Sequence, residues 1–225
     1  WYTWLEQGRP IHVSTSIIES LSRVLLLYAA ERRHLYLLAN QPFPNEILED
    51  ERAVSPALMH FLDSLILCPA MVTDQRWNVV AWNRAADLLY GSFREMSERE
   101  RNIVWRMFTD EKHRQQCPEW EINAKQLLGN FRASCGQYIE DPWLVAFVED
   151  LKQESVEFEA WWSLHEIDDS RETYKNLNHP MAGLLSFEVN SFDVMDGTRL
   201  KLMIHVPKPG TDTADKMKLL LDHYS

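Results

Sequence analysis

Acidic pairs and histidines are the side chains of this chain that could support acid–base catalysis or metal binding. Asp168 and Asp169 are adjacent, and Glu157 and Glu159 lie two positions apart, but both pairs have the character of solvated charge on a loop and a helix. The eight histidines are too scattered to suggest a metal cluster. The sequence also contains no glycine-rich phosphate loop, no His-Glu-x-x-His pair and no nucleophile elbow. It therefore predicts no catalytic residue, no metal site and a protein that is not an enzyme.

The composition is that of an ordinary soluble globular protein, with 45% hydrophobic and 25% charged residues. The most apolar stretch, residues 58–72, is interrupted by His60 and Asp63, so the sequence predicts no membrane span. The three cysteines, Cys68, Cys117 and Cys135, are odd in number and show no paired spacing. We interpret them as buried thiols in a reducing compartment, which favours a cytoplasmic protein.

Charge is distributed unevenly along the chain. Residues 1–40 contain four arginines and three glutamates, a net charge of +1, whereas the whole chain carries −11, so the remainder carries −12. This difference favours two modules with different partners. The boundary is predicted at residues 41–55, a stretch rich in proline and acidic residues that shows no sustained period. We therefore expect domains at 1–40 and 56–225, joined by this linker.

The hydrophobic periodicity predicts an α+β fold for the second domain. A helix is expected at about 56–67, then two strands joined by a tight turn, then a helix that Asn83 caps and Gly91 ends. Four helical patterns follow, the best of them running from Trp120 to Tyr138, and another beginning after Asp141 and Pro142. Period-two alternation on either side of residues 195–197 predicts a β-hairpin, and a helix is expected at about 212–224. Two or three strands in this tail complete an antiparallel sheet covered by several helices.

The start of the chain resembles part of a DNA-binding domain. Tyr2, Leu5, Glu6, Gly8 and Arg9 are similar to the end of the recognition helix in lambda-repressor-like helix-turn-helix domains of the XRE class, and helical patterns at 14–27 and 29–39 follow as in that class. The resemblance implies that Trp1, Trp4 and Arg9 contact DNA. The alternative is that both tryptophans pack within their own domain.

The body of the chain resembles the ligand-binding domain of MmyB-like transcription regulators. The matching segments include Trp82 to Ala85, Arg101 to Phe108, Phe131-Arg132, Ser155 to Trp162 and His179-Pro180. The resemblance implies a PAS-like domain behind a helix-turn-helix domain, with a fatty acid as its ligand. The strand–turn–strand and capped helix at the start of this domain, and its closing hairpin, agree with a PAS-like fold.

A fatty acid would need an apolar tunnel and one polar partner for its carboxylate, because an unpaired buried carboxylate is costly. For the partner we select Arg132 first, then His179 and His205, although each has an alternative structural or surface role. We expect the tunnel beneath the C-terminal hairpin. Its predicted lining is Trp105, Phe108, Leu127, Phe131 and Trp161 from helices, with Phe187, Val189, Leu202 and Ile204 from the sheet. An error of one residue in strand phase would exchange the two sheet faces.

These observations predict a cytoplasmic, dimeric transcription regulator. A fatty acid in the PAS-like body would shift the population toward one arrangement of two DNA-binding heads on a palindromic operator. Its partners would be DNA, the fatty acid and a second copy of the chain, and no other cofactor is expected. Two alternatives remain open at this point: a protein-interaction or dimerisation module without a ligand, and a haem or flavin sensor.

Overall fold

The computed structural model describes residues 13–41, 54–135, 141–164, 174–196 and 198–224. The chain forms two compact units, Trp1–Leu48 and Glu49–Ser225, and the boundary between them falls inside the stretch predicted to be a linker. Among the helices of the described residues, none combines the length and the apolar character needed to cross a lipid bilayer.

The first unit contains two described helices, α2 (Thr15–Val24) and α3 (Ala29–Leu38). Ile18 and Tyr36 are buried between them, and the Tyr36 hydroxyl donates to Glu19 Oε1 at 2.7 Å. Val24 and Leu25, at the C-terminal end of α2, are exposed where the helix ends and the chain turns. The predicted DNA contacts Trp1, Trp4 and Arg9 lie outside the described residues, so they stay predictions.

The second unit is built on a five-stranded antiparallel sheet in the order β2-β1-β5-β4-β3. Its strands are β1 (Ala70–Thr73), β2 (Val79–Trp82), β3 (Tyr174–His179), β4 (Gly183–Asp193) and β5 (Lys201–Pro207). The pairs β1–β2, β3–β4 and β4–β5 are neighbours in sequence, whereas β1 pairs with β5 and so joins the two ends of the unit. The α+β prediction is confirmed, with the hairpin and the closing helix α11 (Thr213–His223) where the periodicity placed them.

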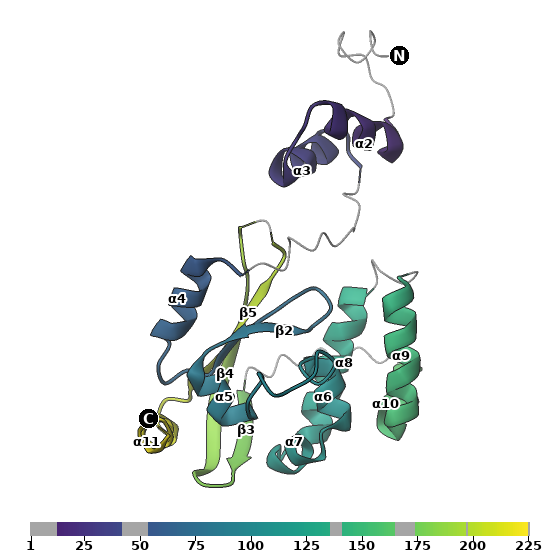
Figure 1. The fold of residues 1–225 in the computed structure, drawn as a ribbon. Helices are drawn as coiled ribbons and strands as arrows, with labels where there is room; N and C mark the ends of the chain where they lie inside the picture. Colours follow the sequence, from purple (N-terminus) through teal and green to yellow (C-terminus); the bar gives the residue numbers. More distant parts are fainter. Residues whose placement is uncertain (1–12, 42–53, 136–140, 165–173, 197, 225) are drawn as a thin grey trace. The chain divides into compact units, whose positions relative to one another are not determined.

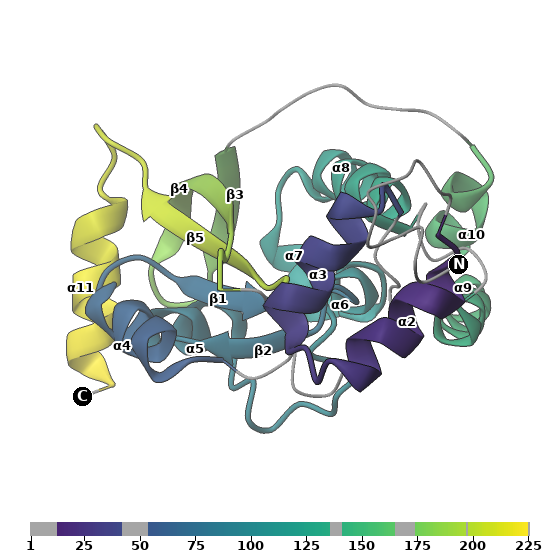
Figure 2. The ribbon, with the colours of Figure 1, turned by 90° about the horizontal axis from the view of Figure 1, so that it is seen from above.

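Helices cover the two faces of this sheet unequally (Figures 1 and 2). On one face α4 (Pro56–Ser64) packs Leu62 against Val72, Leu202 and Ile204. The opposite face supports the larger core, to which α6 (Ile103–Thr109), α8 (Trp120–Cys135), α9 (Pro142–Glu154) and α10 (Val156–Trp162) contribute buried apolar side chains. The helices α5 (Arg84–Tyr90) and α11 pack against each other and contribute to the same core, and the short α7 (Glu111–Gln116) adds the buried His113. The sequence predicted four helical patterns between α5 and the tail, whereas the described residues of that region form five helices, with α6 and α7 as separate short helices.

Side-chain caps explain where most of these helices begin, since a cap oxygen accepts a backbone N–H that has no partner in the first turn. The capping residues are Ser55, Asn83, Asn102, Asp110, Asp141 and Ser155. Asp110 both ends α6 and caps α7, with its Oδ1 accepting the His113 N–H at 3.0 Å. These short-range contacts fix the helices around the larger core.

Candidate functional site

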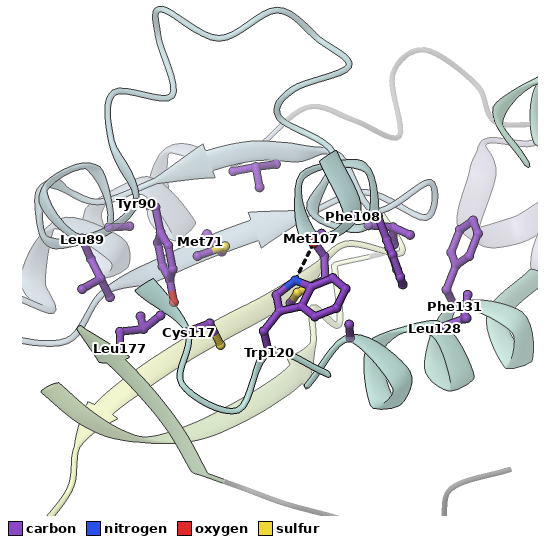
Figure 3. Close-up of a cluster of buried hydrophobic side chains, with 14 of the residues drawn as sticks. Met71, Leu89, Tyr90, Met107, Phe108, Cys117, Trp120, Leu128, Phe131 and Leu177 are labelled. Atoms are coloured by element: carbon purple, nitrogen blue, oxygen red, sulfur yellow. Dashed lines mark hydrogen bonds between the residues drawn. The ribbon is translucent and has the colours of Figure 1, made fainter. Parts of the chain in front are cut away.

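Aromatic side chains from α6, α8 and α10 pack together in the larger core, and Figure 3 shows Phe108 and Trp120 among them. The ring of Phe108 is edge-on to Phe158, Trp120 and Trp161, with centroid distances of 5.1, 6.1 and 6.1 Å. Trp120 is buried and donates its Nε1–H to the Met107 carbonyl at 2.8 Å. Edge-to-face contacts of this kind are favourable between large rings, so the three helices are joined by one aromatic cluster.

Several large side chains at the border of this core remain partly exposed. Trp161 and Leu127 lie on α10 and α8, and Trp105 on α6 packs its ring 6.0 Å from Phe147. Lys125 Nζ lies 4.9 Å from the Trp161 ring centroid. The layer of α6, α8 and α10 thus has an aromatic border, with its apolar side facing the core.

A polar cluster lies in the same core, next to the sheet. At its centre is Tyr90, the last residue of α5, whose hydroxyl lies 3.0 Å from Nε2 of His205 on β5. The Tyr90 ring centroid is 5.6 Å from that of His205 and 6.0 Å from that of His113 on α7. Lys175 on β3 places its Nζ 5.2 Å from the Tyr90 ring centroid. Three basic side chains from three different elements therefore surround one buried tyrosine.

Strand register places Lys175 and His205 on the sheet face that supports the larger core. Val189 on β4 is the Cα partner of His205, and Lys175 is the partner of Phe187. Phe187 is buried and lies edge-on to His205, with their ring centroids 6.1 Å apart. Because side chains alternate between sheet faces, Lys175, Phe187, Val189 and His205 all point toward the larger core.

Burial and nearby positive charges keep the two imidazoles of this cluster uncharged. Burial, reinforced by the nearby Lys175 ammonium, lowers the pKa of His205 to about 3. Burial also holds the pKa of His113 well below its ordinary value, and the positive charges of Lys175 and Arg106 act in the same direction. Burial lowers the pKa of Lys175 and raises that of Tyr90. Both imidazoles are thus neutral at pH 7, when each ring has one N–H donor and one acceptor nitrogen.

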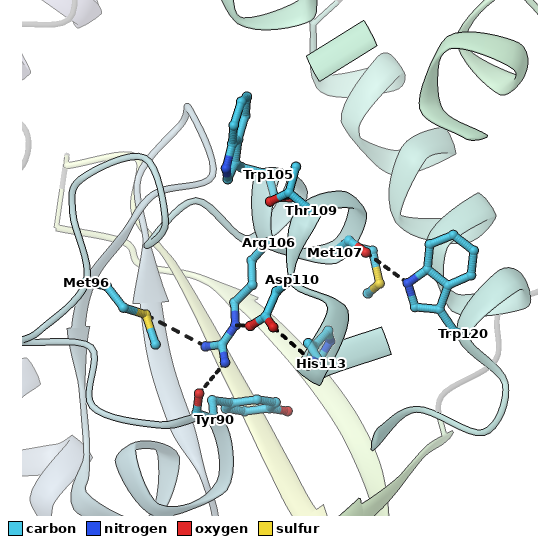
Figure 4. Close-up of polar contacts among 9 residues, drawn as sticks. All are labelled: Tyr90, Met96, Trp105, Arg106, Met107, Thr109, Asp110, His113 and Trp120. Atoms are coloured by element: carbon cyan, nitrogen blue, oxygen red, sulfur yellow. Dashed lines mark hydrogen bonds and ion pairs between the residues drawn. The ribbon is translucent and has the colours of Figure 1, made fainter. Parts of the chain in front are cut away.

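A fourth basic group, Arg106, is neutralised within this environment (Figure 4). Its Nε donates to Asp110 Oδ2 at 2.9 Å, and its Nη2 donates to the Tyr90 carbonyl. The guanidinium carbon lies 5.9 Å from the Tyr90 ring centroid. Because Asp110 is paired with Arg106, its carboxylate does not neutralise the charge of Lys175.

Most of the predicted lining residues lie on this core, and two do not. Phe108, Phe131, Phe187 and His205 are buried in or beside it, and Trp105, Leu127, Trp161 and Val189 are partly buried on the same side. Leu202 and Ile204 are buried on the opposite sheet face against α4. They alternate with Met203 and His205 along β5, so the strand phase decides which pair faces the larger core.

The other two predicted carboxylate partners occupy structural positions. Arg132 on α8 donates to the carbonyls of Leu164 and Trp161 at 2.6 and 3.2 Å and so binds the end of α10. His179, at the end of β3, accepts the Met181 and Ala182 N–H groups at Nδ1, both at 3.3 Å. Its Nε2 lies 3.3 Å from the Leu88 carbonyl, which fixes the β3–β4 turn to α5.

Sequence reasoning missed three residues of the polar cluster: Tyr90, His113 and Lys175. Tyr90 continues the apolar spacing of Ala86 and Leu89 in α5, a signal for burial but not for a site. Lys175 lies in a strand whose sequence, YKNLNH, is too polar to show the alternation that identifies a buried face. Nothing in the spacing of His113 connects it with the other two.

No group of three or more His, Cys, Asp or Glu side chains arranged to hold a metal ion occurs among the described residues. The model of one protein family, described as the MmyB-like transcription regulator ligand binding domain, matches residues 54–220. No curated protein matched the chain. The matched range includes the whole sheet, the aromatic core and the polar cluster.

Proposed function

Because this chain belongs to the MmyB-like transcription regulators, whose ligand-binding domain it carries over residues 54–220, we propose that it is a DNA-binding regulator controlled by a fatty acid. The aromatic core between the sheet and helices α6, α8 and α10 is the proposed site of the ligand. The observation that carries this proposal is the location, in one matched domain, of a large apolar cluster next to Lys175, which forms no ion pair among the described residues.

The apolar part of the site accounts for the affinity. Burying each methylene group contributes about 0.8 kcal/mol, so about a dozen methylenes supply enough free energy for tight binding after the cost of ordering the chain. Phe108, Trp161 and Leu127 would contact the alkyl chain, since they extend from the core to its partly exposed border. This assignment keeps the helix-derived lining predicted from the sequence.

Regulation would follow from a shift in population. The proposed ligand stabilises one arrangement of a dimer and thereby changes the spacing of two DNA-binding heads, formed in each copy by the N-terminal unit with Trp1, Trp4 and Arg9 at the DNA. A ligand that binds both arrangements equally would have no such effect.

Two measurements test this proposal on the whole protein. Solvent extraction and mass spectrometry of the purified chain should release a fatty acid, and delipidation followed by addition of dodecanoate should change its affinity for its own promoter DNA. A haem or flavin spectrum, or a dimer that neither carries nor binds a lipid, would overturn the fatty-acid proposal in favour of one of the alternatives. Failure to bind promoter DNA at low salt, where phosphate contacts are strongest, would overturn the regulator proposal.

A further inference from the structure

We infer that the polar cluster around Tyr90 binds a singly charged anionic group, a carboxylate, through the Lys175 ammonium, with the Tyr90 hydroxyl and the His113 Nδ1 as hydrogen-bonding partners. The inference rests on the proposed function, because it assigns the head group of the ligand. It replaces Arg132 with Lys175 as the charged partner.

The first argument is an unbalanced charge. In the part of the chain that the structure describes, no carboxylate forms an ion pair with Lys175. Asp110 is paired with Arg106, and Glu119 accepts the Asn176 Nδ2–H at 3.3 Å. A cation removed from water is costly unless an anion or several acceptors surround it, so the site favours a negatively charged ligand.

The second argument is an unsatisfied nitrogen. Nδ1 of His113 is buried without a hydrogen-bond partner among the described residues, and the side chain is 4% exposed. Most buried polar atoms in folded proteins have a partner, and an exception calls for an explanation such as a bound group. The His113 ring lies against Tyr90, whose ring is also next to the Lys175 ammonium. The unbalanced charge and the unsatisfied nitrogen therefore point to one position.

The Tyr90–His205 contact allows the hydroxyl to serve as a donor. When His205 carries its proton on Nε2, that N–H donates to the tyrosine oxygen, and the Tyr90 O–H is free to donate to the ligand. In the other tautomer the Tyr90 O–H donates to Nε2 of His205. The tyrosine oxygen can then only accept a hydrogen bond, and it has no proton to offer a carboxylate. A bound carboxylate selects the first arrangement, because it accepts but does not donate.

The site suits a carboxylate better than a phosphate. It offers one unpaired ammonium and neutral donors, which balance one negative charge but not two. Leu177 and Phe187, which point from β3 and β4 to the same side as Lys175, are fully buried and apolar. In Figure 3, Cys117 and Trp120 lie between Tyr90 and the Phe108 side of the cluster. An alkyl chain attached to the carboxylate would extend in that direction.

The test compares dodecanoate with dodecanol, which has the same chain length and no charge, by titration calorimetry of the delipidated full chain. Wild-type protein should bind dodecanoate at least about tenfold more tightly than dodecanol. Lys175→Met removes the charge but keeps the length, and should weaken dodecanoate binding by about 10- to 100-fold, the effect of one charged hydrogen bond. Its dodecanol affinity should change by less than about threefold, which also shows that the variant is folded. Lys175→Arg should keep most of the acid preference, and Tyr90→Phe should lose about three- to tenfold in dodecanoate affinity.

Lys152→Met on the surface of α9 makes the same chemical change away from the core and should bind both ligands as the wild type does. Equal wild-type affinities for acid and alcohol would overturn the carboxylate site while leaving the apolar ligand proposal intact. If the wild type bound neither compound, the proposed function itself would fail. If Lys175→Met does not fold, three other results test the carboxylate site. They are the wild-type preference for dodecanoate over dodecanol, the retained preference of Lys175→Arg, and the loss of about three- to tenfold expected for Tyr90→Phe.

Discussion

Asn83 holds more of the fold together than its position as a helix cap implies, and replacing it with Asp tests this. Its Oδ1 accepts the Ala86 N–H, the cap bond of α5, and also the Ala70 N–H on β1, both at 3.0 Å. Its Nδ2 donates to the carbonyls of Leu65 and Cys68 at 2.7 and 2.9 Å. One side chain thus joins α5, β1 and the loop after α4.

Asn83→Asp separates the role of Asn83 as the cap of α5 from its role as a donor to the loop after α4. As a cap, Asp equals Asn, so a residue that only caps a helix would lose almost no stability. Here the substitution removes both N–H donations and turns a carboxylate oxygen toward two carbonyl oxygens. Each buried carbonyl that loses its partner costs about 1–3 kcal/mol, and the buried charge adds to this. We therefore expect the free energy of unfolding to fall by about 3–5 kcal/mol.

Urea unfolding at neutral pH, followed by far-ultraviolet circular dichroism and tryptophan fluorescence, measures this loss. Asn130→Asp on the exposed surface of α8 introduces the same charge without buried partners, and should change stability by less than about 0.5 kcal/mol. If the two variants unfolded at the same urea concentration, Asn83 would be a helix cap only, and its contacts to the α4–β1 loop would contribute nothing measurable.

Three further predictions address the core and the site. The unfolded chain takes up a proton at His205 below pH 6.5 but the folded chain does not until about pH 3, so lowering the pH from about 7.5 to 5.5 should reduce the unfolding free energy by about 1.4 kcal/mol through this residue. Urea titrations of His205→Gln should show a shallower pH dependence than wild type, and an unchanged slope would contradict the neutral imidazole. Arg132→Met should lower stability by about 1–2 kcal/mol by freeing two carbonyls at the end of α10, and calorimetry should find dodecanoate affinity within about twofold of wild type; a tenfold loss would return Arg132 to the ligand site. Trp77 donates its Nε1–H to Ser134 Oγ at 2.9 Å, and a double-mutant cycle of Trp77→Phe and Ser134→Ala should yield a coupling of about 0.5–1.5 kcal/mol, whereas additive effects would rule that bond out as a stabilising contact.

Local signals in the sequence predicted much of the second unit correctly. Asn83 and Gly91 bound α5 as expected, with Gly91 in the left-handed region at φ 87°, and Asp141 with Pro142 starts α9. These signals work because capping and glycine conformation depend on a few neighbouring residues. The same reasoning underestimated Asn83, since its partners Leu65 and Cys68 precede it by 15 residues or more and lie outside any local pattern.

Features that depend on contacts between distant parts of the chain could not be predicted from the sequence. The pairing of β1 with β5 joins residues 70–73 to residues 201–204, and no turn or spacing specifies that register. Trp77 adopts a positive φ of 67° at the end of the β1–β2 turn, where its N–H donates to the Asp74 carbonyl at 3.0 Å. Its ring also packs against Phe131 and bonds to Ser134 on α8, and a sequence window around the turn contains neither partner.

The polar cluster shows why its function could not be predicted from spacing but can be argued from energetics. A core formed only for stability would place an apolar side chain at position 175, because a partly buried ammonium without an ion pair among the described residues reduces the stability of the fold. A ligand that supplies the missing charge removes that penalty only when bound, so the chain without ligand is less stable than the complex by an amount that depends on ligand concentration. The same unbalanced charge that weakens the empty domain therefore increases the difference between its free and bound states. That difference is the property that a ligand-controlled regulator requires, and it resides in Lys175 rather than in the aromatic side chains, which stabilise the fold whether or not a ligand is present.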